Sequence, residues 1–156
     1  MSQDAERIDL DTSVGYLLKE AASALRAAME AELRPLGMTV THYSCLELLA
    51  QRPGLSNSEL ARGAFVTRQS MNVLLRSLER AGVVERASEP TAGKALPTRL
   101  TASGRQDLER ASAAVRGVER RMLGGMDDAE RAAVLSGLRS MVASLHADRR
   151  QPPPTH

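Results

Sequence analysis

Side chains that hydrogen-bond to DNA cluster in the stretch TRQSMNVLLRSL, residues 67–78. Arginine pairs with the edge of guanine, the amides of asparagine and glutamine pair with adenine, and arginine also neutralises phosphates. In a helix each residue turns the side chain by roughly 100°, which places the polar members of this stretch on one face. They are Arg68, Gln69, Asn72 and Arg76. Such a face either contacts DNA or is merely solvated, and the elements around it decide between the two.

The opposite face of the same stretch is apolar. Its members recur at the i, i+3, i+4, i+7 spacing of a helix packed on a core: Met71, Leu74, Leu75 and Leu78. Thr67 is expected to cap the start of this helix, and Gly82 is expected to cap its end. The segment is therefore predicted to be a helix that packs through one side and leaves the polar side free.

The neighbouring segments complete a recognisable arrangement. SNSE, residues 56–59, matches the capping box at the start of a short helix, for which Gly63 is the expected terminator. Residues 83–87 and 96–101 are typical of two short strands joined by a turn-rich segment. Two helices joined by a turn and followed by a hairpin form a winged helix-turn-helix, whose second helix enters the major groove. The polar face of residues 67–78 is therefore expected to meet DNA.

Longer amphipathic helices are expected on both sides of this motif. Apolar residues step by three and four over residues 10–28, 108–122 and 134–145. Asp127 with Glu130 resembles a cap for the last of these helices. Thr39 is expected to cap a further helix with four residues turned inward: Tyr43, Leu46, Leu49 and Ala50.

The predicted fold class is mainly α with a small β-hairpin wing. A winged helix-turn-helix at residues 37–101 is flanked by helical regions at 1–36 and 102–147, and a disordered tail follows at 148–156. The terminal helices could complete the core of a monomer. Their separation from the central motif, together with their apolar stripes, favours dimerisation.

Composition supports a soluble DNA-binding chain and excludes several other classes. The net charge is +2 and the pI is about 9.1, with the cations concentrated between residues 61 and 105. Only two tyrosines and one phenylalanine are present, which argues against binding of single strands by base stacking. One cysteine, three scattered histidines and no nucleophile–base pattern predict no disulfide, metal, cofactor or enzyme activity. Without a signal sequence or membrane span, the chain is expected to be cytoplasmic.

The sequence resembles the MarR family of bacterial transcriptional regulators. The resemblance lies in residues 33–50, 55–86 and 96–105 and extends over roughly residues 10–145. It implies a homodimer in which the first and last helices interlock, and a palindromic operator in double-stranded DNA. It also implies repression or activation, often relieved by a small, frequently phenolic effector. Two positions depart from the family: His42 stands where glutamine is common, and Ala92 and Lys94 replace the Asp-x-Arg signature of the wing.

Together these features predict a dimeric, DNA-binding transcriptional regulator acting as a repressor. Its DNA-binding residues are predicted to be Ser56, Ser58, Thr67, Arg68, Gln69, Ser70, Asn72, Arg76, Arg86, Lys94 and Arg99. Ser56 could instead serve only as a cap. Arg86 and Arg99 could instead pair with Glu85 or Glu89.

Two further sets of residues are predicted from the resemblance. The small-molecule site is expected to include Tyr16, Met38, His42, Cys45 and Phe65. The dimer interface is expected to include Leu10, Val14, Leu17, Leu138, Val142 and Leu145. Two alternatives remain: a redox-sensing regulator acting through Cys45, and a winged helix that docks a protein without binding DNA. The second would need apolar anchors on the polar helix face, where only Val73 qualifies.

Overall fold

The computed structural model describes residues 7–86 and 97–149, which form two units that divide after Val118. The first unit begins with the long helix α1 (Val14–Leu33) and the short 3-10 helix η2 (Arg34–Leu36). The helices α2 (Val40–Gln51), α3 (Asn57–Gly63) and α4 (Arg68–Arg80) follow. Strands β1 (Val84–Arg86) and β2 (Thr98–Leu100) lead into α5 (Ala102–Met122), whose last turn belongs to the second unit together with α6 (Asp128–Asp148).

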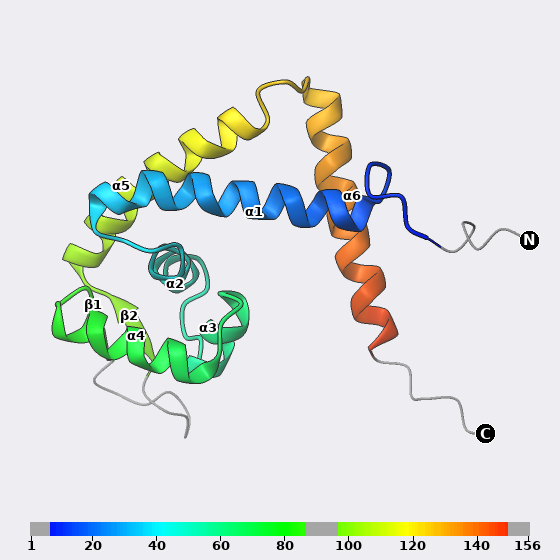
Figure 1. Ribbon diagram of the computed structural model, residues 1–156. Helices are drawn as coiled ribbons and strands as arrows, with labels where there is room; N and C mark the ends of the chain where they lie inside the picture. The colour runs from blue at the N-terminus through cyan, green and yellow to red at the C-terminus, as the bar shows by residue number, and fades with distance from the viewer. Residues whose placement is uncertain (1–6, 87–96, 150–156) are drawn as a thin grey trace, which may run out of the picture. The chain divides into compact units, whose positions relative to one another are not determined.

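The central elements form the winged helix-turn-helix that the sequence predicts. Helix α3 packs on α4, and β1 pairs with β2 in an antiparallel register that sets Val84 opposite Leu100 and Glu85 opposite Arg99. Figure 1 shows α2, seen nearly end-on, between α1 and the α3–α4 pair. Pro97 immediately precedes β2, so it withdraws no donor from the paired residues. The tip of the hairpin, residues 87–96, lies outside the described residues.

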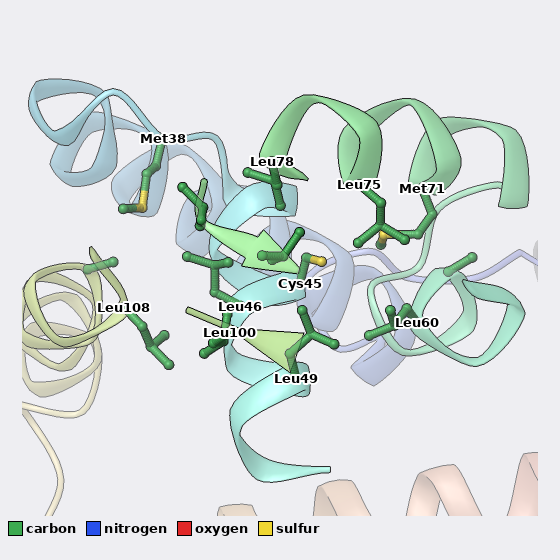
Figure 2. Close-up of a cluster of buried hydrophobic side chains, with 14 of the residues drawn as sticks. Met38, Cys45, Leu46, Leu49, Leu60, Met71, Leu75, Leu78, Leu100 and Leu108 are labelled. Atoms are coloured by element: carbon green, nitrogen blue, oxygen red, sulfur yellow. The ribbon is translucent and has the colours of Figure 1, made fainter. Parts of the chain in front are cut away.

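One hydrophobic cluster holds the first unit together. Figure 2 shows Cys45, Leu46 and Leu49 of α2 meeting side chains of α3, α4, β2 and α5. Met71, Leu75 and Leu78 come from the apolar stripe of α4, and all three are buried. The periodicity of residues 67–78 therefore identified the packed side of this helix correctly. Ala50, expected to face inward, is exposed, because it lies next to the end of α2 where the helix leaves the core.

Local capping signals account for most helix boundaries. Thr39 and Thr67 accept backbone amide bonds at the starts of α2 and α4, and capping boxes open α3 and α6, all as predicted. Gly82, at φ +74°, closes α4: its N–H donates to Glu79 O at 3.1 Å, and Val83 N–H donates to Leu78 O at 2.9 Å. This two-bond closure is the Schellman motif.

One predicted boundary is wrong, and a second is confirmed with a difference in detail. Helix α1 begins at Val14 with Ser13 as its cap, so Leu10 lies in the turn before the helix. Helix α3 ends at Gly63, as predicted, but the left-handed residue that closes it is Phe65, where φ is +59°. A Cβ at Gly63 would lie 2.9 Å from a methyl carbon of Leu48, so glycine also favours close packing of α3 on α2.

Thr101 links the wing to α5. Its hydroxyl lies 2.6 Å from Gly82 O and 3.1 Å from Val83 O, to which it donates, and it accepts from Gly104 N–H at 3.1 Å. Gly104 allows this close approach, because a Cβ there would lie 2.1 Å from Val83 O. The start of α5 is thereby fixed against the end of α4.

The second unit consists of the last turn of α5 and α6. Helix α6 opens on the predicted capping box, in which Asp127 accepts from Glu130 N–H at 2.8 Å and Glu130 accepts from Asp127 N–H at 3.2 Å. No residue of α6 is buried. Its apolar side chains therefore lie on the surface of the isolated chain.

Candidate nucleic-acid interface

The outer face of α4 carries the predicted DNA-reading side chains. Arg68, Gln69 and Arg76 are exposed, whereas Asn72 is half-buried. Val73, which is 61% exposed, lies among them. The face is therefore cationic and rich in hydrogen-bonding groups, with one aliphatic side chain available to a thymine methyl group.

The first turn of α4 is held by Thr67 and Ser70. The Thr67 Oγ1 accepts from Ser70 N–H at 3.1 Å, and the two hydroxyl oxygens lie 2.9 Å apart in a hydrogen bond. Both side chains are exposed. These two hydrogen bonds fix the turn from which Arg68 and Gln69 project. Helix-turn-helix proteins contact base edges with this part of the helix.

A hydrogen bond that the sequence did not reveal joins the two helices of the motif. Asn57 Nδ2 donates to Asn72 Oδ1 at 2.9 Å, and both residues are half-buried. Asn57 was therefore missed as a residue of the site. Its position directly after the Ser56 cap places Asn57 in the first turn of the short helix. Its bond to Asn72, however, depends on how α3 crosses α4, which the sequence does not give.

The N-terminus of α3 presents two serines. Ser56 Oγ accepts from Glu59 N–H at 3.2 Å, and Glu59 accepts from Ser56 N–H at 2.8 Å. Ser56 is thus a cap, as the alternative interpretation held, while its hydroxyl hydrogen can still be donated outward. Ser58 is half-buried in the first turn of α3.

The two wing arginines are paired with carboxylates. Arg99 Nε lies 3.0 Å from Glu85, its cross-strand neighbour, and Arg86 Nε lies 3.9 Å from Glu79 at the end of α4. All four side chains are well exposed, and such surface pairs contribute little free energy, so a phosphate can displace either carboxylate. Lys94 lies outside the described residues.

The predicted small-molecule residues lie in different surroundings in this chain: Met38 and Cys45 belong to the hydrophobic cluster, whereas Tyr16 and Phe65 border separate surface hollows. Met38 and Cys45 are buried, His42 is half-buried, and Phe65 is 94% exposed on the turn between α3 and α4. Tyr16 borders a surface hollow on α1 together with Lys19, Glu20, Ser23, Ala24 and Ala27. Phe65 borders a different hollow, together with Leu48, Arg52, Leu55, Glu59, Arg62 and Gly63.

His42 and Cys45 differ in their chemistry although both belong to α2. Burial lowers the pKa of His42, and the nearby carboxylate of Asp107 opposes this shift only in part. The Nε2 atom of His42 is buried without a hydrogen-bond partner in the described part of the chain. Burial raises the pKa of the Cys45 thiol to about 12, so the nucleophilic thiolate is scarce at neutral pH. This geometry disfavours the redox-sensor alternative.

The residues predicted for the dimer interface leave apolar surface on α1 and α6. Val14 and Leu17 of α1 are exposed, as is Leu10 just before it. On α6 Leu138, Val142 and Leu145 are exposed, and a hollow there is lined by Leu135, Leu138, Arg139, Val142 and Ala143. Each helix, considered by itself, has the surface of an element that packs on another chain.

Neither a metal cluster nor a membrane-spanning helix is found in the described part of the chain. Within residues 7–86 and 97–149, no three His, Cys, Asp or Glu side chains are grouped so that they could hold a metal ion. Across the same residues, every helix is too short or too polar to cross a bilayer.

Comparison with known proteins gives consistent matches. Residues 36–95 match the family model described as MarR family. The HTH-type transcriptional repressor Rv2887 of Mycobacterium tuberculosis is 48% identical over 113 residues, which cover 72% of this chain and 81% of that protein. The crystal structure of Rv2887 with salicylic acid is similar at a TM-score of 0.71 and 42% identity, over 84% of this chain and 97% of that one. The crystal structure of Rv2887 with DNA is similar at a TM-score of 0.70 and 41% identity, over 84% of this chain and 98% of that one.

Proposed function

Because this chain belongs to the MarR family of transcriptional regulators, we propose that it is a dimeric repressor that binds a pseudo-palindromic operator in double-stranded DNA. It acts as a regulator and not as an enzyme, and its site of action is the bacterial cytoplasm. The main support for the proposal is the composition of the outer face of α4. There Arg68, Gln69 and Arg76 are exposed on a helix whose other side is anchored in the core.

The proposed contacts divide into two groups. Arg68 and Gln69, in the first turn of α4, and Asn72, one turn further on, contact base edges. Phosphates are contacted by the hydroxyls of the helix starts and by the remaining cations: Ser56, Ser58, Thr67, Ser70, Arg76, Arg86, Lys94 and Arg99. This arrangement supports readout by α4 and positioning by the elements around it.

The dimer is proposed to form through the terminal regions, residues 1–36 and 102–147. Support comes from the apolar side chains left exposed on α1 and on α6. A two-fold dimer presents two α4 helices to half-sites roughly one turn of DNA apart, which is why the operator should be pseudo-palindromic.

A small aromatic acid is proposed to lower operator affinity, since Rv2887 has been crystallised with salicylic acid. In this chain Cys45 is fully buried and Phe65 is 94% exposed, so the proposed ligand residues do not line one cavity of the monomer together. His42 is the strongest member of the set, because its buried Nε2 lacks a partner among the described residues and could bond to a ligand hydroxyl or carboxylate.

The test is selection of bound sequences from a random duplex pool, followed by affinity measurements on the selected operator. Changing Arg68 or Gln69 to alanine should cost about 1–3 kcal/mol of discrimination between operator and single-base variants. Changing Arg76 to alanine should weaken all duplexes alike and reduce the salt dependence. If the wild-type protein enriches no sequence from the pool, the proposal is refuted.

A further inference from the structure

Phe65 occupies a backbone conformation that phenylalanine normally avoids. Its φ is +59°, and among the described residues it is the one non-glycine with a positive φ. Left-handed backbone is costly for a bulky side chain, whereas glycine adopts it freely. Gly37 and Gly82 take this role at the ends of η2 and α4, at φ +72° and +74°.

The backbone around Phe65 is fixed by hydrogen bonds. Phe65 N–H donates to Arg62 O at 3.2 Å, and Val66 N–H donates to Ala61 O at 3.0 Å, which is the same closure that Gly82 makes at the end of α4. The local geometry therefore calls for glycine. The phenyl ring gains nothing from packing in compensation, because the side chain is 94% exposed.

The surroundings of the ring indicate what it contacts. Phe65 lies two residues before Thr67, the cap of α4, and so adjoins the first turn that carries Arg68. It borders the hollow that includes the exposed Arg52 and Arg62 together with Glu59, whose carboxylate accepts from Ser56 N–H. An apolar ring beside two arginines complements a surface on which anionic groups alternate with apolar ones. The sugar–phosphate backbone of DNA is such a surface, and the proposed DNA-reading face of α4 begins three residues further along the chain.

We propose that Phe65 is a DNA-contact residue whose ring packs on a deoxyribose of the operator backbone, beside phosphates held by the neighbouring arginines. This inference rests on the proposed function and adds a contact outside the polar face of α4. Because the contact is apolar, it releases no counterions, and because it meets a sugar, it carries no sequence information. The ring is already exposed in the free protein, so it is available to DNA without a rearrangement of the core.

The proposal predicts opposite effects of one substitution on folding and on binding. Phe65→Gly removes the strain and should raise the thermal midpoint, because glycine suits the left-handed position. The same substitution should weaken binding to operator and to random duplex alike, by about 3- to 30-fold, through loss of apolar burial. The salt dependence and the base preferences should match those of the wild type.

Two controls isolate the ring. Phe65→Tyr retains it and should bind within about twofold of the wild type, whereas Phe65→Asn tolerates the backbone but lacks the ring and should bind like Phe65→Gly. Sedimentation of all three variants should match the wild type.

Three outcomes would overturn the proposal. Unchanged DNA affinity of Phe65→Gly, with wild-type binding intact, would refute this contact alone. Dissociation of Phe65→Gly into monomers would place the ring between two copies of the chain. Failure of the wild type to bind any duplex would refute the proposed function and this contact together.

Discussion

The side-chain amide of Asn57 on α3 is hydrogen-bonded to that of Asn72 on α4 at 2.9 Å. Recognition of adenine by an asparagine needs both ends of the amide, one to accept from N6 and one to donate to N7. The bond to Asn57 occupies one of the two lone pairs on Asn72 Oδ1, so the other lone pair and both amide hydrogens remain available to a base. The link therefore restrains the orientation in which Asn72 presents its amide to DNA.

Removing the side-chain amide of Asn57 should change the base preference of Asn72. With Asn57→Ala, the amide of Asn72 loses this restraint on its orientation, so the base preference should change at one position in each half-site. The loss of the link should also reduce the free energy of unfolding by about 0.5–1.5 kcal/mol. Affinities for operators with single-base changes provide the measurement. Asn72→Ala is the reference, and an Asn57→Ala profile identical to that of the wild type would show that Asn57 does not restrain the readout.

A charge on the apolar stripe of α6 should abolish both dimerisation and operator binding. Leu138 is an exposed apolar residue of this helix, and Leu138→Glu would bury a carboxylate in the proposed interface. Sedimentation and operator affinity should change together. Ser136 is also exposed on α6 but lies off the stripe, so Ser136→Glu is the matched control and should remain dimeric. A Leu138→Glu protein that is monomeric yet binds the full operator normally would contradict the assignment.

Stability should fall on acidification partly because of His42. Burial lowers the pKa of this imidazole in the folded state, so below about pH 6.5 the unfolded chain binds a proton that the folded chain resists. The contribution of His42 is thus fully present above that pH and is lost as the pH falls toward the lowered pKa. His42→Gln should show a shallower loss of unfolding free energy between pH 7 and pH 5. An identical dependence of unfolding free energy on pH in both proteins would show that His42 does not contribute to this loss of stability.

Cys45 should be inert in the folded protein. Its side chain is 0% exposed, and burial raises its pKa to about 12, so a thiol reagent at neutral pH should react only as fast as the chain opens. Adding denaturant should restore rapid reaction with one thiol per chain. Operator affinity should also survive mild peroxide treatment. Loss of affinity that Cys45→Ala prevents would revive the redox alternative.

The sequence predicted those features that depend on neighbours in the chain. The Thr67 cap, the capping box at Ser56 and the closure at Gly82 are local hydrogen-bonding devices, and all three are present. The conformation of Phe65 could not be predicted, because a phenylalanine rarely takes a positive φ. Gly63 was correctly predicted as the end of α3, but the left-handed closure falls two residues later, at Phe65. The Asn57–Asn72 bond could not be foreseen, since it depends on how two helices cross.

The junction at Thr101 ties the position of α4 to that of α5. One hydroxyl joins Gly82, just after α4, to the first turn of α5, and α4 is also anchored in the core by Met71, Leu75 and Leu78. A tilt of α5 at this point would therefore be passed to α4 and the core around it together. The 13 residues of α4 span about 20 Å, and a tilt of about 5° would displace Arg68 at the far end by nearly 2 Å. Hydrogen bonds to bases tolerate only a few tenths of an ångström. A tilt of a few degrees at this junction would thus be enough to misplace Arg68 against a base edge.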